Sequence, residues 1–316
     1  MWILELKDKR EERRREKGSS GSTEVSLTPR YPSTLTLKTW YRFKKNKAAL
    51  AGGILLLLFL TSALLAPYLA PYDPLAQDLY GRLKPPVWDL KGSPEHLLGT
   101  DDFGRDILSR ILYGARISFQ VGLVSVGISL GFGIIFGALS GYYSGALDHL
   151  LMRFMDILLA FPGILLAILI VAVLGPGLFN AIIAIGIVGI PEYARIIRAS
   201  VLVERQREYV QAARSLGARD LRILLLTILP NCFAPILVKT TLGFATAIVE
   251  AAGLSFLGLG AQPPTPEWGA MLNQARALIL RAWWVITFPG LAIFLSTLGF
   301  NLLGDGLRDV LDPRLK

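Results

Sequence analysis

Four long runs without a charged residue constrain this chain more than any other feature. They cover residues 48–72, 117–147, 157–191 and 282–304 of the 316. A helix needs about 20 apolar residues to cross the hydrocarbon core of a bilayer, so each run is long enough to span it. The fold class that follows is an all-α integral membrane protein.

The third of these runs is too long for a single crossing. The segment Gly175-Pro176-Gly177 interrupts it near its middle, and such a segment breaks a helix. We therefore expect a hairpin of two spans, at 154–174 and 178–198. The other three runs are each expected to form one span.

A further span is expected at residues 232–253, where Lys239 and Glu250 interrupt an otherwise apolar stretch. The alternative is a peripheral apolar segment packed against the other helices. We favour a span, because charged side chains are tolerated within a membrane when they face protein or water. The sequence thus predicts six transmembrane helices, with both chain ends on the same side.

Composition and motifs argue against several classes of protein. Charged residues make up 18% of the chain, against about 25% in a typical soluble domain, which disfavours a simple soluble enzyme. The single cysteine, Cys232, excludes an internal disulfide and a zinc site built from cysteines. His96 and His149 are far apart in sequence and have no partner at metal-ligand spacing. We expect no metal and no cofactor in this chain.

Motifs for catalysis and for ATP binding are also missing. No glycine is followed by lysine, so there is no GxxxxGK[ST] phosphate-binding loop, and HExxH and GxSxG are absent. Asp156 is an isolated carboxylate near the end of a span and is expected to pair with Arg153, three residues before it. The chain is therefore not expected to be an enzyme.

The distribution of Lys and Arg predicts the orientation. The face that holds both termini and residues 195–222 carries 24 of them, and the opposite face carries eight. Cytoplasmic loops carry the excess of positive charge, so both termini and the 195–222 loop are expected in the cytoplasm.

The basic residues at the N-terminus do not indicate a nucleic-acid partner. Residues 5–17 mix Lys and Arg with Glu, and no recognisable nucleic-acid-binding fold follows. A solvated or lipid-facing anchor is the better interpretation. The predicted organisation is a cytoplasmic basic tail and linker at 1–47, the first transmembrane helix at 48–70, an extracytoplasmic segment at 71–116, a five-helix core at 117–304 that contains the loop 199–230, and a cytoplasmic tail at 305–316.

The end of the extracytoplasmic segment alternates acidic residues with arginine over 98–110. Thr100 or Asp101 can cap a helix that runs into the second span. The alternation suits an amphipathic helix on the outer membrane interface. Because Arg105 and Arg110 are available to pair with the carboxylates, a catalytic role for these acids is less well supported.

Glycines recur at four-residue spacing in the second span. Gly127 and Gly131 form one series, and Gly133, Gly137 and Gly141 form another. Small residues at this spacing share a helix face and let the backbone of a neighbour approach closely. The neighbour is either another helix of the same bundle or a second, similar subunit, and the spacing alone does not distinguish these two.

The cytoplasmic loop between the fourth and fifth spans predicts a helix-turn-helix. Residues 204–216 have the pattern of a helix, Gly217 ends it, and a second helix starts near Asp220. Ala212 and Ala213 lie beside the turn, where small side chains suit docking into a groove of another protein. The alternative is an ordinary surface loop, for which this connection is long.

Glu250 is a candidate functional residue because ionisable side chains within spans are costly. It lies 11 residues after Lys239, about 16 Å along a helix, so the two do not pair directly within that helix. We hypothesise that Glu250 shapes an outer gate, beside a segment at 254–260 that could be re-entrant. The alternative is a structural role in which a hydrogen bond satisfies its carboxylate.

At the helix-turn-helix the chain resembles a known family. Gln211-Ala212-Ala213 is followed at fixed spacing by Gly217 and by Leu229-Pro230. This is similar to the Glu-Ala-Ala signature of the membrane subunits of ABC importers, with Gln211 in place of the Glu and Thr227 in place of an Ile. Further stretches resemble the C-type permease of the dipeptide/oligopeptide/nickel class: 98–110, 113–116, 156–162, 254–260, 262–269 and 301–309. The resemblance covers roughly residues 40–316.

The resemblance implies a function and a set of partners. Such a permease forms half of a translocation pathway in a prokaryotic inner membrane for peptides or related solutes. The resemblance does not decide whether the substrate is a peptide, nickel, glutathione or an oligosaccharide. Its implied partners are a second homologous permease, two cytoplasmic ATPase subunits that bind ATP and Mg, and an extracytoplasmic binding protein. Closure of the ATPases would drive alternating access by rigid-body movement. The implied coupling residues are Tyr209, Gln211, Ala212, Ala213, Arg214, Leu216, Gly217 and Arg219.

Two other readings of the sequence compete with the importer. A self-sufficient secondary transporter or channel should show functional charges in several spans or inverted repeats of broken helices. A non-transporting scaffold would not need the long helix-turn-helix in the cytoplasmic loop.

Overall fold

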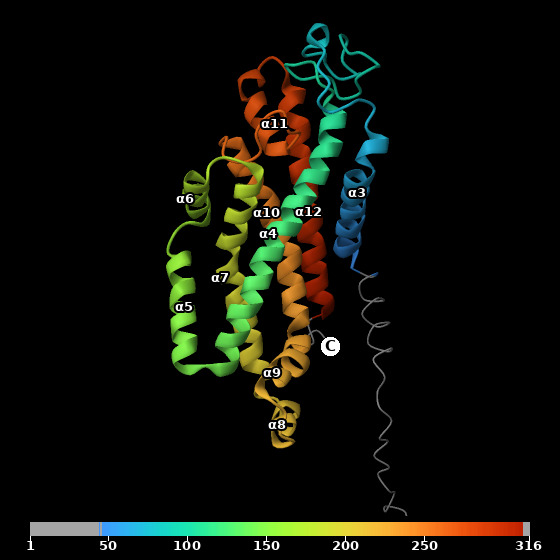
Figure 1. The fold of residues 1–316 in the computed structure, drawn as a ribbon. Coiled ribbons are helices and arrows are strands. Elements are labelled where there is room, and N and C mark those ends of the chain that lie inside the picture. The colour runs from blue at the N-terminus through green and yellow to red at the C-terminus, as the bar shows by residue number, and fades with distance from the viewer. Residues whose placement is uncertain (1–43, 45, 312–316) are drawn as a thin grey trace, which may run out of the picture. The chain divides into compact units, whose positions relative to one another are not determined.

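The computed structural model describes Lys44 and residues 46–311, all of which belong to one unit, Tyr41–Lys316. Nearly all of the predicted basic tail at 1–47 and the last residues of the predicted tail at 305–316 lie outside the described residues. The described chain is a bundle of long helices (Figure 1). Within it there is no β-strand, only an isolated antiparallel bridge between Thr100 and Asp106.

The helices follow one another with short connections, apart from residues 70–106 and 257–267. In chain order they are α3 (Lys47–Leu69), a 3₁₀ turn (Leu79–Gly81), α4 (Ile107–Tyr143), α5 (Gly145–Leu159), α6 (Gly163–Leu174), α7 (Leu178–Glu204), α8 (Glu208–Ser215), α9 (Asp220–Arg222), a π-helical stretch (Ile223–Ile228), a 3₁₀ stretch (Leu229–Cys232), α10 (Phe233–Phe256), α11 (Trp268–Ala275), a 3₁₀ turn (Arg276–Leu278) and α12 (Trp283–Leu311).

Five helices in the described part are long and apolar enough to cross a membrane. They are α3, α4, α7, the continuous helical stretch Asp220–Phe256 that ends in α10, and α12. The span expected at 232–253 is thereby confirmed as helical. A sixth crossing exists only if α5 and α6 together count as one span.

The span predicted at 154–174 is not one straight helix. The chain bends by 88° between α5 and α6. Pro162 lies at the bend with extended backbone angles, and the residue that precedes a proline is disfavoured in a helix. The 12 residues of α6 reach only about 18 Å, which is short of the hydrocarbon thickness.

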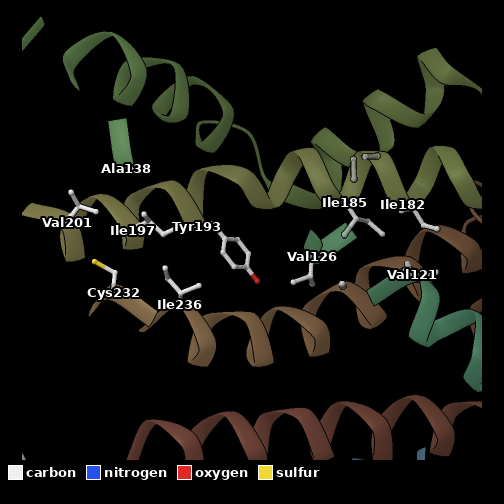
Figure 2. Packing of buried hydrophobic residues seen from close by; sticks show 14 of the residues in the cluster. Val121, Val126, Ala138, Ile182, Ile185, Tyr193, Ile197, Val201, Cys232 and Ile236 are labelled. Carbon is white, nitrogen blue, oxygen red and sulfur yellow. The ribbon is translucent and has the colours of Figure 1, made fainter. Parts of the chain in front are cut away.

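The long helix α4 packs most extensively on α7. A Cβ added at Gly133 would lie 2.4 Å from the Cβ of Tyr193, and one added at Gly137 would lie 2.5 Å from the carbonyl oxygen of Ala194. Gly141 meets α7 in the same way. These three glycines therefore let the two helices approach closely. Figure 2 shows the buried core beside this contact, with Tyr193 extending from α7 towards α10.

The other glycine series of α4 has a different environment. Nothing lies within 4 Å of a Cβ added at Gly127 or at Gly131. Within the described chain these two glycines thus take no part in helix packing, and their face of α4 is left open.

Residues 70–106 form an irregular segment beside α11, and we call this end of the bundle the α11 end. Arg105 donates a hydrogen bond to Gln274 of α11 at 2.9 Å, and Trp284 of α12 donates to the carbonyl of Thr100 at 3.1 Å. The opposite end, which carries α8 and α9, is the α8 end (Figure 1).

The amphipathic helix predicted over 98–110 is wrong in its first half. Gly99 and Gly104 have φ of +82° and +74°, values that break a helix and that glycine adopts readily. The cap of α4 is Asp106, whose carboxylate accepts a 2.8 Å hydrogen bond from the backbone N–H of Ser109. Neither Thr100 nor Asp101 caps this helix.

The predicted pairing of the acids at this end with arginine is confirmed for Asp101. The Asp101 carboxylate lies 2.7 Å from Arg105 and 3.7 Å from Arg110. All three side chains are almost fully buried, so they hold the segment together away from water.

Ion pairs connect the bent segment to α7. The guanidinium of Arg198 donates two hydrogen bonds of 2.6 Å to Asp148 of α5. Arg195 donates to Asp156 at 2.6 Å, so the pairing of Asp156 with Arg153 expected from the sequence is wrong. The carboxylate faces α7 across the bundle, and spacing along the chain did not indicate that neighbour.

Candidate functional site at the α8 end

The turn between α7 and α10 projects from the end of the bundle (Figure 1). The helix predicted at 204–216 is shorter in the structure, because Glu204 still belongs to α7 and α8 begins at Glu208. Gly217 follows α8 with φ of +76°, the left-handed conformation that ends many helices. The expected second helix starts at Asp220 and continues, with π and 3₁₀ stretches, into α10.

One side of α8 anchors it and the other side is exposed. Val210 is 1% exposed and belongs to the main core cluster together with Ile223 and Leu224. Ala212 is exposed, and Leu216 is 88% exposed. A short helix with small and apolar residues on its free side offers a surface for another protein.

Polar contacts fix this turn to the end of α4. The hydroxyl of Tyr142 donates a 2.6 Å hydrogen bond to Asp220, and Arg214 of α8 donates to the same hydroxyl at 3.5 Å. Arg205 donates to the carbonyl oxygens of Gly141 and Tyr142, each at 3.0 Å. Arg205 thereby satisfies acceptors that the C-terminal end of a helix leaves unpaired.

Tyr209 is fixed at the start of α8. Its hydroxyl donates a hydrogen bond to the carboxylate of Glu204. Partial burial and this hydrogen bond raise the pKa of Tyr209 to about 12. The phenol thus stays protonated at neutral pH and remains a donor.

The structure places all eight of the sequence-predicted coupling residues in this turn, and further residues contact them. Tyr209, Gln211, Ala212, Ala213 and Arg214 lie on α8, and Leu216, Gly217 and Arg219 lie in the turn that follows. Tyr142 and Arg205 were not predicted. An aromatic residue and an arginine at the ends of spans are common in membrane proteins, so nothing in the sequence pointed to their contacts with α8.

A second candidate site lies between α4, α7 and α10, around Glu250. A cavity of about 60 Å³ there is bordered by all three helices, and its polar lining consists of Ser125, Ser129, Glu192, Tyr193, Lys239, Thr246 and Glu250. Lys239 forms an ion pair with Glu192 of α7. Among the described residues Glu250 has no hydrogen-bond or ion-pair partner, so the structure does not support the alternative of a satisfied hydrogen bond.

The segment 254–260 after Glu250 is only partly helical. Residues 254–256 complete α10, and the chain then turns at Gly258 towards α11. The sequence pattern did not indicate where within this segment the helix ends.

Comparison with known proteins identifies the family. The family model described as binding-protein-dependent transport system inner membrane component matches residues 133–316. The chain belongs to this family. A second family model, the N-terminal TM domain of oligopeptide transport permease C, matches residues 34–86.

Individual members of the family are similar over most of their length. The di/tripeptide transport system permease protein DppC of Pseudomonas aeruginosa is 54% identical over 90% of this chain and 94% of its own length. The dipeptide permease DppC of Escherichia coli is 50% identical over 90% and 95% of the two chains. The glutathione permease GsiD of Pectobacterium atrosepticum is 50% identical over 88% and 90%.

A solved structure supports the fold. The inward-facing methionine ABC transporter MetNI has a chain with a TM-score of 0.55 and 19% identity, covering 65% of this chain and 98% of that one. Together with the sequence relatives, this shows that the family member described here is a membrane permease subunit of an ABC importer. The alternative of a self-sufficient transporter or channel is thereby set aside.

The acidic and histidine residues do not cluster as metal ligands. In Lys44 and residues 46–311 no group of three or more His, Cys, Asp or Glu side chains could hold a metal ion.

Proposed function

We propose that this permease forms one half of the pathway of an ATP-driven importer for di- and tripeptides. The observation that carries the proposal is the 54% identity with a di/tripeptide permease over 90% of the chain. The glutathione permease at 50% identity agrees with it, since glutathione is itself a tripeptide. Peptide transport thus accounts for both relatives.

The proposal that the chain is part of an ATP-driven importer also implies its partners. Because the chain has no GxxxxGK[ST] loop, ATP and Mg bind to two separate ATPase subunits. A second homologous permease completes the pathway, and an extracytoplasmic binding protein delivers the peptide. The excess of Lys and Arg supports an orientation in which the α8 end and both termini lie in the cytoplasm of a prokaryotic cell and the α11 end lies outside the inner membrane.

The turn around α8 is the contact with one ATPase in this proposal. The exposed Ala212 and Leu216 enter a groove of the ATPase, and the buried Val210 keeps α8 attached to the bundle. Gly217 and Arg219 border the contact. When the ATPases close on ATP, α8 moves with them and shifts the helices to which it is bonded. Glu250 lies on the pathway side and shapes the gate.

The proposal is tested by purifying the tagged chain from its native membrane in mild detergent and identifying every chain that accompanies it. Two ATPase chains and one second permease are expected. The complex is then reconstituted in liposomes with its binding protein, and ATP-driven uptake of dialanine is measured. Purification of the chain alone, or uptake without ATP, would refute the proposal.

A further inference from the structure

The face of α7 and α10 that carries Glu192 does not suit contact with lipid. The side chain of Glu192 is 58% exposed in the single chain, and Thr246 beside it is also exposed. An ionisable side chain that faces lipid is costly, so such residues face protein or water. This face therefore borders the pathway or a partner subunit rather than the bilayer.

One end of the cavity on this face is electrically balanced. Lys239 forms an ion pair with Glu192 and lies 5.5 Å from the centre of the Tyr193 ring. The cation is therefore satisfied by a carboxylate and by an aromatic face. Glu250 is the second carboxylate of the cavity, and the ion pair that Lys239 forms is with Glu192 and not with Glu250.

The hydroxyl groups of the cavity cannot satisfy Glu250 because they donate elsewhere. Ser125 donates to the carbonyl of Val121 at 2.6 Å, and Ser129 donates to the carbonyl of Gly186 at 2.7 Å. Thr246 and Tyr193 likewise donate to backbone carbonyls. A hydroxyl whose proton is used offers only lone pairs. These hydroxyls therefore present acceptors to Glu250, and the charged donor of the lining, Lys239, is engaged by Glu192.

We propose that Glu250 binds the α-ammonium group of a peptide as the peptide passes through the pathway. This inference rests on the proposed function. An ammonium group supplies three donors and the missing positive charge, and its bond to a carboxylate is charge-assisted. The cavity of about 60 Å³ holds roughly two waters, which is room for this end group while the rest of the peptide stays in the pathway.

The test uses a reporter thiol in the assembled complex. Thr246→Cys is introduced together with Cys232→Ala, and the rate of thiol modification is measured with dialanine or propionyl-alanine, which differ only by the amine. Dialanine is expected to slow the modification about threefold or more at millimolar concentration, and propionyl-alanine is expected to have little effect. Adding Glu250→Gln should remove the protection. Equal protection by both compounds, protection that survives Glu250→Gln, or no protection would each overturn the proposal.

A second measurement does not depend on the reporter. Glu250→Gln should lower ATP-driven uptake of dialanine about tenfold or more, as expected for loss of a hydrogen bond to a charged group. Glu250→Asp keeps the charge and should stay nearer to the unaltered complex. Glu95→Gln, at an exposed position that does not line the cavity, should take up dialanine as fast as the unaltered complex. Normal uptake by Glu250→Gln would sink the ammonium site and leave the proposed function intact. Failure of the unaltered complex to take up dialanine would instead refute the proposed function.

Discussion

The hydroxyl of Tyr142, one residue before the end of α4, donates a 2.6 Å hydrogen bond to the carboxylate of Asp220, the first residue of α9. The same hydroxyl accepts a 3.5 Å bond from Arg214 on α8. One side chain thus connects the helix that packs most extensively on α7 to both sides of the exposed turn. In the proposed function, this polar bridge and the apolar core would both transmit movement of α8 to α4.

Replacing Tyr142 with Phe should weaken this transmission. The variant keeps the ring and loses the hydrogen bond to Asp220, which is worth about 1.5–3 kcal/mol, together with the longer bond from Arg214. We expect ATP hydrolysis to stay near normal while peptide uptake per ATP falls several-fold. The measurement is uptake and phosphate release from the same liposomes.

The neighbouring Tyr143 provides the matched control. Its ring packs at 87° against that of Tyr142, and its hydroxyl makes no hydrogen bond within the described chain. Tyr143→Phe should leave the ratio of uptake to hydrolysis unchanged. If both variants behave alike, the bond between Tyr142 and Asp220 has no role in coupling.

Hydropathy predicted the helices well where a helix is straight and failed where it bends. The runs at 48–72 and 282–304 became α3 and α12, because long apolar segments have few other stable structures in a bilayer. The bend at Pro162 lies inside a charge-free run, so the absence of charge gave no sign of it.

The candidate site was predictable in part for similar reasons. The turn at Gly217 follows from local chemistry and was expected. The contacts of Tyr142 and Arg205, and the partner of Asp156, depend on which helix lies opposite, and periodicity along one helix does not contain that information. Gly127 and Gly137 each belong to a series of glycines at four-residue spacing. Only the structure shows that α7 contacts Gly137 and not Gly127.

The two glycine series predict opposite effects of added volume. Gly137→Ala places a Cβ 2.5 Å from the carbonyl oxygen of Ala194, so α4 and α7 must move apart, at a cost of about 1–3 kcal/mol. Gly131→Ala meets nothing within 4 Å in the chain and should leave the isolated subunit as stable or slightly more stable. Thermal unfolding of both variants in one detergent measures the difference. Equal midpoints would contradict the tight contact between α4 and α7.

A substitution on the exposed side of α8 should remove the ATPase subunits from the complex and leave the second permease bound. Ala212→Trp enlarges an exposed side chain, so the bundle should fold normally while the fit into the ATPase groove is lost. We expect the variant to purify with the second permease and without the ATPases. Leu280→Trp, at a 97% exposed position of the α11 end, is the control and should retain all chains. Retention of the ATPases by Ala212→Trp would show that they dock elsewhere.

The stability of the bent segment formed by α5 and α6 should depend more on the Asp148–Arg198 ion pair than on the Asp156–Arg195 pair. Asp148 is 8% exposed and accepts two bonds from Arg198 and one from Ser140. Asp148→Asn leaves a partly buried guanidinium without its counter-charge, so we expect a loss of about 1–3 kcal/mol in stability.

Asp156→Asn is the matched change in the same helix. The Asp156–Arg195 pair is about half exposed on both sides, and exposed pairs contribute about 0–1 kcal/mol. Unfolding of the two variants is compared in low and high salt, since only the exposed pair is strongly screened. We expect a lower midpoint for Asp148→Asn at both salt concentrations, and a small shift for Asp156→Asn that high salt abolishes. If the two substitutions destabilise the subunit equally, the Asp148–Arg198 pair does not hold α5 against α7.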